Sequence, residues 1–301
     1  MKLTGLHLLL TYKCTNECDH CFVFGSPRQS GTMTIPKIME ILRQAKDSKT
    51  ITSIYFEGGE PFLFYPIMVR GVRDAKEMGF DVGIVTNGYW AAEAEDALEW
   101  LRPLNGLIDD LSVSSDLYHW NEMIEIYASN TKKAALELGI PVGYICIAQP
   151  VEENSGSAAN QIPEEEIKVR YRGRAAENLV KYAEMIQWEE FSECPHEDLK
   201  DPGRVHVDAF GNLQICQGIS IGNMFKKPLK EICDIYNPED DPVIGPILKG
   251  GPAELVRKYN ISHKEKYADA CHLCFETRSS LKDNFPEILT PCQSYRIVEE
   301  Y

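Results

Sequence analysis

Residues 6–21 read Leu6-His-Leu-Leu-Leu-Thr-Tyr-Lys-Cys14-Thr-Asn-Glu-Cys18-Asp-His-Cys21, an apolar run followed at once by three cysteines spaced C-x3-C-x2-C. The apolar run predicts a β-strand. Three thiolates on one short loop can hold three irons of a cubic [4Fe–4S] cluster, whereas most biological clusters have every iron capped by protein. One iron is then left open, which suggests chemistry at the metal. The same cysteines could instead be part of a zinc site, although no fourth ligand is obvious nearby.

Extended and helical patterns alternate six times over the first two thirds of the chain. The extended patterns cover residues 6–10, 51–56, 80–85, 107–113, 141–147 and 166–171. The helical patterns cover residues 36–45, 66–78, 91–101, 121–138 and 175–185. Such alternation predicts a parallel sheet with helical crossovers, either curled or open.

The pattern changes after about residue 191. Two alternating apolar segments, 204–208 and 212–216, flank Gly211 and predict a hairpin. Short helical patterns follow at 228–235 and 252–259. We therefore expect two domains, 1–188 and 189–301.

Composition excludes several classes of partner. The 301 residues hold 46 acidic and 31 basic side chains, for a formal charge of −15. That balance argues against nucleic acid and anionic membranes, which attract basic patches. No apolar run approaches the ~20 residues of a membrane span, and no signal peptide is evident. Ten cysteines in such a chain indicate a cytoplasmic, reducing setting, where cysteine spacing is better interpreted as metal binding than as disulfides.

The cysteine loop, followed at the next strand end by Glu57-Gly-Gly-Glu-Pro61, resembles the radical S-adenosylmethionine (SAM) enzymes. The resemblance covers residues 5–185 and implies an α/β fold, a partial (β/α)6 TIM-like barrel. It implies that Cys14, Cys18 and Cys21 hold a [4Fe–4S] cluster whose open iron is chelated by the amino and carboxylate groups of SAM. Reduction would then cleave SAM to methionine and a 5′-deoxyadenosyl radical.

The resemblance also assigns a set of residues to SAM binding. Gly58 and Gly59 lack a Cβ, so their backbone can approach a ligand closely, and Pro61 stiffens the turn. Other strand ends would face the same mouth, where α/β sheets place ligands. The residues so assigned are Gly58, Gly59, Glu60, Pro61, His20, Asn87, Ser112, Ser114 and Arg172. Ordinary turn, cap or solvated-charge roles remain alternatives for Asn87, Ser112, Ser114 and Arg172.

A second set of cysteines comprises Cys194, Cys216, Cys271 and Cys274. Their arrangement, ending in a C-x2-C turn, resembles the twitch domain, a shortened SPASM domain. It implies a small C-terminal α+β domain holding one auxiliary [4Fe–4S] cluster. Ser280 stands where a full SPASM pattern needs another cysteine. Zinc is the alternative metal for four cysteines.

Three further cysteines have less certain roles. Cys292 could replace Cys194 as a ligand, could support a second incomplete cluster with Cys233, or could be a plain thiol. Cys146 and Cys233 have apolar neighbours and are interpreted first as core residues.

Two clusters together favour an oxidoreductase that carries out a net oxidation, either dehydrogenation or bond formation. The chain begins almost directly with its first strand, without the N-terminal domain that peptide-modifying relatives often carry, which favours a small polar substrate. A peptide substrate, in peptide or protein maturation, is the first alternative, and a non-catalytic electron carrier or scaffold is the second. Asp116 and His119 are candidate bases, although a helix-capping aspartate and a surface histidine are the favoured alternative roles. A reductant such as flavodoxin or ferredoxin is the expected partner.

Overall fold

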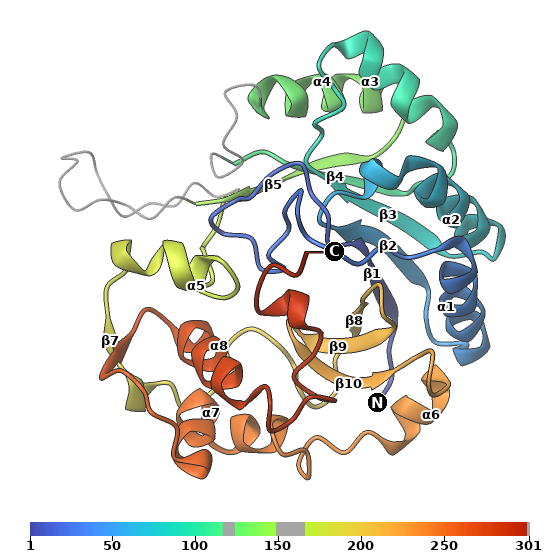
Figure 1. Ribbon diagram of the computed structural model, residues 1–301. Coiled ribbons are helices and arrows are strands. Elements are labelled where there is room, and N and C mark those ends of the chain that lie inside the picture. The colour runs from blue at the N-terminus through green and yellow to red at the C-terminus, as the bar shows by residue number, and fades with distance from the viewer. Residues whose placement is uncertain (117–123, 149–165, 300–301) are drawn as a thin grey trace.

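The computed structural model describes residues 1–116, 124–148 and 166–299, and its centre is a nine-stranded sheet (Figure 1). The strand order is β10-β9-β8-β1-β2-β3-β4-β5-β6, and β1 to β6 are parallel. The strands span β1 Gly5–Thr11, β2 Ser53–Gly58, β3 Asp81–Thr86, β4 Asp110–Ser114, β5 Val142–Ile147, β6 Glu166–Ile167, β8 Arg204–Val207, β9 Asn212–Cys216 and β10 Ile219–Asn223.

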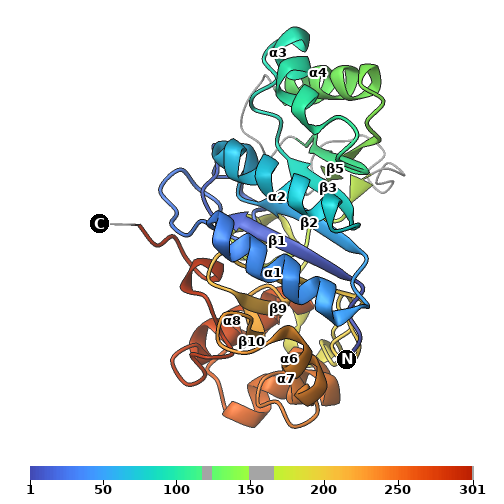
Figure 2. The ribbon, with the colours of Figure 1, turned by 90° about the vertical axis from the view of Figure 1, so that its right-hand side faces the viewer.

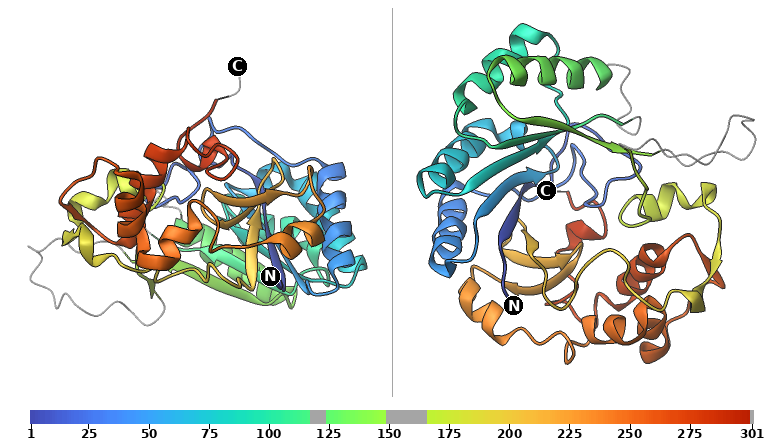
Figure 3. Two further views of the ribbon diagram at one scale, coloured as in Figure 1. Left: turned by 90° about the horizontal axis from the view of Figure 1, so that it is seen from below. Right: turned by 180° about the vertical axis from the view of Figure 1, so that it is seen from behind.

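Four helices cover the outer face of this sheet (Figures 1 and 2). They are α1 Ile35–Ser48, α2 Tyr65–Glu77, α3 Ala94–Leu101 and α4 Ile124–Glu137. The view from behind shows the strands curving inside this arc of helices, with the C-terminal segment across the opening (Figure 3, right). The α/β fold, an open part-barrel of parallel strands with helical crossovers, is confirmed.

Strand alternation separates a core face from a concave face. Leu6, Leu8 and Leu10 of β1 are fully buried in the main core, which also holds side chains of α1 and α2. The intervening residues of β1 face the other way, because successive side chains of a strand point to opposite faces. Alternate residues of β1, β2 and β4, those whose side chains point away from the main core, line a cavity of about 700 Å³.

The C-terminal third continues the same sheet. The predicted hairpin is confirmed as the antiparallel pair β8–β9, and β8 also pairs in parallel with β1. Val207 and Leu213 consequently belong to the main core, whereas a second core contains Ile215, Ile219 and Phe275. The division at 188/189 stays a prediction, because the sheet itself runs across it.

The remaining elements of the C-terminal third are helices α6 Leu229–Ile235, α7 Ile244–Tyr259 and α8 Ala270–Leu281, and a two-stranded sheet of β7 Ile186–Gln187 with β11 Lys266–Tyr267. The helix α7 is bent at Gly250 and Gly251, where the backbone leaves helical angles.

Two expected elements are shorter than predicted. The helix expected over 175–185 is α5, which spans only Ala175–Asn178, because the chain soon becomes extended and pairs as β7 with β11. The strand expected over 166–171 stops at Ile167, and Tyr171 instead donates its backbone N–H to Asp269.

No helix in the described ranges is long and apolar enough to cross a membrane.

If the hairpin is part of the main core, a cavity made there should destabilise the whole sheet. Leu213 is fully buried on β9, and we expect Leu213→Ala to lower the free energy of unfolding by about 2–5 kcal/mol. Urea denaturation followed by circular dichroism measures this. Ile235→Ala is the control, because Ile235 is 60% exposed and should change stability by less than about 0.5 kcal/mol. If Leu213→Ala destabilised only a separate unfolding transition of the C-terminal third and left the rest of the sheet unchanged, the shared core would be contradicted.

Candidate metal and cofactor site

The loop after β1 brings three thiols near one another, with Cys14 and Cys18 buried and Cys21 half-buried. Cys14 and Cys18 are 8% and 6% exposed, and the Cys21 sulfur is close enough to both to contribute to raising their pKa. Burial raises the pKa of the Cys14 thiol to about 12, and burial with the neighbouring sulfurs raises the pKa of Cys18 well above its usual range. Crowded thiols of this kind become thiolates when a metal replaces the protons. The residues therefore fit a metal cluster.

Two amide groups point at these sulfurs. The backbone N–H of Gly25 donates to Cys21 Sγ at 3.2 Å, and the side-chain amide of Asn87 lies 3.7 Å from Cys14 Sγ. Asn87 also donates to Thr15 Oγ1 at 3.0 Å. Hydrogen bonds to sulfur favour its charged form. Asn87, predicted to contact SAM, thus lies directly beside the cysteine loop.

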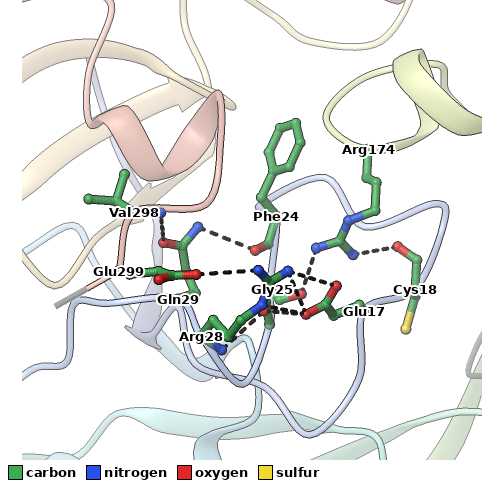
Figure 4. Close-up of polar contacts among 10 residues, drawn as sticks. Glu17, Cys18, Phe24, Gly25, Arg28, Gln29, Arg174, Val298 and Glu299 are labelled. Atoms are coloured by element: carbon green, nitrogen blue, oxygen red, sulfur yellow. Dashed lines mark hydrogen bonds and ion pairs between the residues drawn. The ribbon is translucent and has the colours of Figure 1, made fainter. Parts of the chain in front are cut away.

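Arg174 holds the two sides of the loop together (Figure 4). Its guanidinium donates to the carbonyl oxygens of Cys18 at 2.7 Å and Gly25 at 2.8 Å, and its backbone N–H donates to Cys21 O. The preceding Gly173 has φ +60°, and a Cβ there would lie 2.6 Å from Cys21 O. Arg174 therefore shapes the backbone between the cysteines.

The C-terminal tail contacts the same loop (Figure 4). The buried amide of Gln29 donates to Phe24 O and Arg296 O, and its oxygen accepts the N–H of Val298 at 2.8 Å. Residues nearly 270 positions apart are joined here.

Gly58 and Gly59 are required by the cysteine loop itself. A Cβ on Gly58 would lie 2.3 Å from Thr11 O, and one on Gly59 would lie 2.1 Å from Lys13 O. The N–H groups of Gly59 and Glu60 donate to these same two oxygens at 2.7 and 2.8 Å. The sequence reasoning assigned the missing Cβ atoms to a ligand, but in the structure the adjacent backbone takes that space.

The Glu60 carboxylate is fully buried and turned toward the next strand. It accepts the backbone N–H of Phe62 and the hydroxyl of Thr86 on one oxygen, and the N–H of Asn87 on the other. Pro61 opens the 3₁₀ turn Pro61–Phe64 behind it. Glu60 thereby fixes the end of β2 against the end of β3, a positioning role that differs from the expected contact with an amino group.

The other residues expected at the SAM-binding end of the sheet do not gather at one point. His20 Nε2 lies 3.8 Å from Asp116 Oδ2, and Asp116 is buried. Ser112 donates to Asp110 on the concave face, and Ser114 ends β4. His119 lies outside the described residues.

Cys194, Cys216, Cys271 and Cys274 line one cavity in the C-terminal unit. Burial raises the pKa of Cys274 to about 11, although the facing guanidinium of Arg278 lowers it, and burial also raises the pKa of Cys271. Cys271 and Cys274 lie in the first two turns of α8, which is capped by Asp269, so the C-x2-C segment is helical and not the expected turn. Four thiols that line one cavity fit a cluster, whereas no three of these four sulfurs lie within 4.8 Å of one another, as a single zinc ion would need.

Arg172 belongs to this second cavity, which corrects its expected position. Its guanidinium pairs with Glu197 at 3.2 Å, lies 3.6 Å from Cys216 Sγ and covers the ring of Phe22. Burial is the largest single effect and lowers the pKa of Arg172, but Cys216, Cys271 and Glu197 together raise it above its ordinary value. We therefore no longer assign Arg172 to SAM.

The remaining cysteines do not line that cavity. Cys292 is exposed, Cys233 packs against the main core, and Cys146 is half-buried with its sulfur 3.4 Å from Ser115 O. His196, Asp269 and Cys271 place their ligand atoms within 4.8 Å of one another, so a mixed ligand set also exists there.

Sequence reasoning missed a histidine–glutamate–histidine cluster on the concave face. Glu57 lies between His7 and His206, with ion-pair distances of 3.3 and 2.8 Å. Burial opposes ionisation of Glu57, but the two imidazoles lower its pKa well below the usual range. The sequence does contain an indication of this cluster. His7 and His206 each stand between two apolar residues of a predicted strand, so both side chains should point away from the core.

We expect Arg174→Ala to loosen the cysteine loop, because two buried carbonyls lose their donor. The free energy of unfolding should fall by about 1–3 kcal/mol, and iron retained by the loop after reconstitution should fall with it. Urea denaturation and iron analysis measure these effects. Arg43→Ala is the control, because the Arg43 side chain is 60% exposed and forms a surface ion pair with Glu40. It should change neither the free energy of unfolding nor the iron retained. Unchanged iron retention in Arg174→Ala would contradict the role of the clamp.

Metal analysis separates the two cysteine sets. In Cys14→Ala/Cys18→Ala/Cys21→Ala protein we expect about four irons with matching sulfide, held by the second set as one cluster. Cys233→Ala should retain both sites in full. Zinc in place of iron in the triple variant would remove the auxiliary cluster from consideration.

Residues 8–146 match the model of the Radical SAM superfamily. The chain is 31% identical over 111 residues to YydG of Bacillus subtilis (strain 168), a proposed peptide biosynthesis protein, covering 36% of this chain and 35% of YydG. It is 36% identical over 84 residues to the tungsten-containing aldehyde ferredoxin oxidoreductase cofactor-modifying protein of Pyrococcus furiosus (strain ATCC 43587), covering 28% of this chain and 23% of that protein.

The chain thus spans less than half the length of these curated relatives. The crystal structure of BtrN in complex with AdoMet and 2-DOIA is 14% identical, with a TM-score of 0.47 over 77% of this chain and 82% of BtrN. The family match covers β1 to β5 together with the loop that carries the first three cysteines. Residues 8–146 of this chain are a radical SAM superfamily domain.

Proposed function

We propose that this chain is a radical SAM oxidoreductase that acts on a small polar molecule and passes the resulting electron to an auxiliary cluster. The observation that carries the proposal is the set of three neighbouring thiols, two of them buried, on one loop of the radical SAM domain. When bound, a [4Fe–4S] cluster with SAM on its open iron supplies a reductive cleavage of SAM to a 5′-deoxyadenosyl radical, which takes hydrogen from a substrate C–H bond.

The chain's own residues would hold and orient these groups. Cys14, Cys18 and Cys21 would ligate the cluster, with Arg174 fixing the loop between them. The backbone carbonyls of Gly58 and Gly59 remain the candidates for the SAM amino group. Asn87, His20, Ser112 and Ser114 stay proposed contacts at the same edge of the sheet, and Asp116 a proposed base.

The second cavity supports the net oxidation. Cys194, Cys216, Cys271 and Cys274 would cap every iron of a second [4Fe–4S] cluster, an arrangement suited to electron transfer. Arg172 and Arg278, both lining this cavity, would offset part of the negative charge of four thiolates. A cytoplasmic setting and a reductant such as flavodoxin or ferredoxin as partner remain part of the proposal.

The concave face supports a polar substrate. Its cavity of about 700 Å³ begins at the N-terminal ends of β1, β2, β4 and β8 and reaches Glu57, next to Gly58 at the C-terminal end of β2. Its polar lining includes His7, Tyr55, Glu57, Asp110, Ser112 and Arg204. Hydrogen-bonding groups on this open cavity would orient a polar substrate and position one target hydrogen. Modification of a peptide is the second candidate, favoured by the similarity to YydG.

Cleavage of SAM tests the enzymatic proposal directly. Anaerobically reconstituted protein with SAM and dithionite should release 5′-deoxyadenosine, measured by liquid chromatography with mass spectrometry. The Cys14→Ala/Cys18→Ala/Cys21→Ala variant should release none, because no iron remains in that loop. Cys271→Ala/Cys274→Ala should still cleave SAM, since its first site is intact. Well-loaded protein that leaves SAM intact would favour an electron carrier or scaffold instead.

A further inference from the structure

Three polar side chains meet on the concave face, away from both cysteine sets. They come from the adjacent strands β8, β1 and β2, on which His206 is paired directly with His7. Glu57 follows two residues after Tyr55, the β2 partner of His7. Strand pairing therefore fixes all three positions on rigid backbone, with no loop involved.

The ligand atoms are spaced for one cation. One nitrogen from each histidine and one Glu57 oxygen all lie within 4.8 Å of one another. His7 Nδ1 is 3.3 Å from Glu57 Oε2, and His206 Nε2 is 2.8 Å from Glu57 Oε1. Ligands placed about 2.0–2.2 Å from a common Zn²⁺ ion have separations of this size.

The directions of these groups also favour a shared ion over mutual hydrogen bonds. His7 Nδ1 and Glu57 Oε1 are buried atoms that make no hydrogen bond of acceptable geometry in the described part of the chain, although their distances would allow one. Buried polar atoms without a directed partner are costly. A cation between them would satisfy both.

Neighbouring aromatic rings hold the imidazoles in place. The ring of Tyr55 stacks on His7 with centroids 4.7 Å apart and planes 7° apart, and Phe22 lies 6.0 Å from His206. Such support fixes ring orientation around a metal. His7 and Glu57 border the cavity of about 700 Å³, so further coordination positions would open toward it.

We propose that His7, Glu57 and His206 form a binding site for a divalent transition-metal cation such as Zn²⁺, with its remaining positions open to water or to an oxygen of the substrate. Two imidazoles and one carboxylate are a ligand set of catalytic zinc and non-haem iron sites. The site does not depend on SAM chemistry, because neither cysteine set contributes a ligand.

Zinc binding to the cluster-loaded protein tests this site, since iron and sulfide then occupy the thiolates. We expect about one zinc per chain beyond the clusters, retained through gel filtration. Zinc X-ray absorption should show only nitrogen and oxygen neighbours near 2.0–2.1 Å, without the ~2.3 Å sulfur shell of a cysteine site. A sulfur shell, or no retained zinc, would overturn the proposal.

Variants locate the zinc. His206→Ala and Glu57→Gln should each weaken zinc affinity by at least ~100-fold, because even loss of an outer-shell partner costs about 10- to 100-fold. The exposed His263→Ala serves as the matched control and should bind zinc as the unmodified protein does. Glu57→Gln keeps the shape of the side chain, so it remains informative if His206→Ala fails to fold. Full zinc affinity in folded Glu57→Gln and His206→Ala would also overturn the site.

Discussion

The position of β1 between β2 and β8 is the constraint on which the rest of the structure depends. Its apolar side chains anchor the main core, its C-terminal end begins the cysteine loop, and its concave face carries His7. Pairing with β2 brings Gly58 and Gly59 against that loop, while pairing with β8 attaches the C-terminal third. A shift of register on either side would separate groups that now meet within a few ångströms.

Local patterns were sufficient to predict most of the sheet. Strands β1 to β5 and the hairpin follow from apolar periodicity and turn residues, which act over a few positions. The parallel pairing of β8 with β1 could not be predicted in this way, because it joins residues about 200 positions apart. The early end of α5 has a similar cause, since β7 finds its partner β11 far along the chain.

Spacing predicted the two groups of cysteines, but it could not give the direction of individual side chains. Arg172 and Arg174 are separated by one glycine, yet one guanidinium enters the second cavity and the other holds the first loop. The direction of the Glu60 carboxylate was equally unpredictable from spacing, because it is set by hydrogen bonds from Thr86 at the end of β3 and from Asn87 just after it. Orientation of this kind is decided by tertiary hydrogen bonds between distant segments.

The contact between Gln29 and the backbone near Val298 has a consequence for biogenesis. A ribosome makes residue 29 early and residue 298 roughly 270 peptide bonds later, so the loop stays without this support during most of translation. We expect nascent chains that still lack residues 296–298 to be poorer acceptors of iron and sulfide than chains in which those residues have been made.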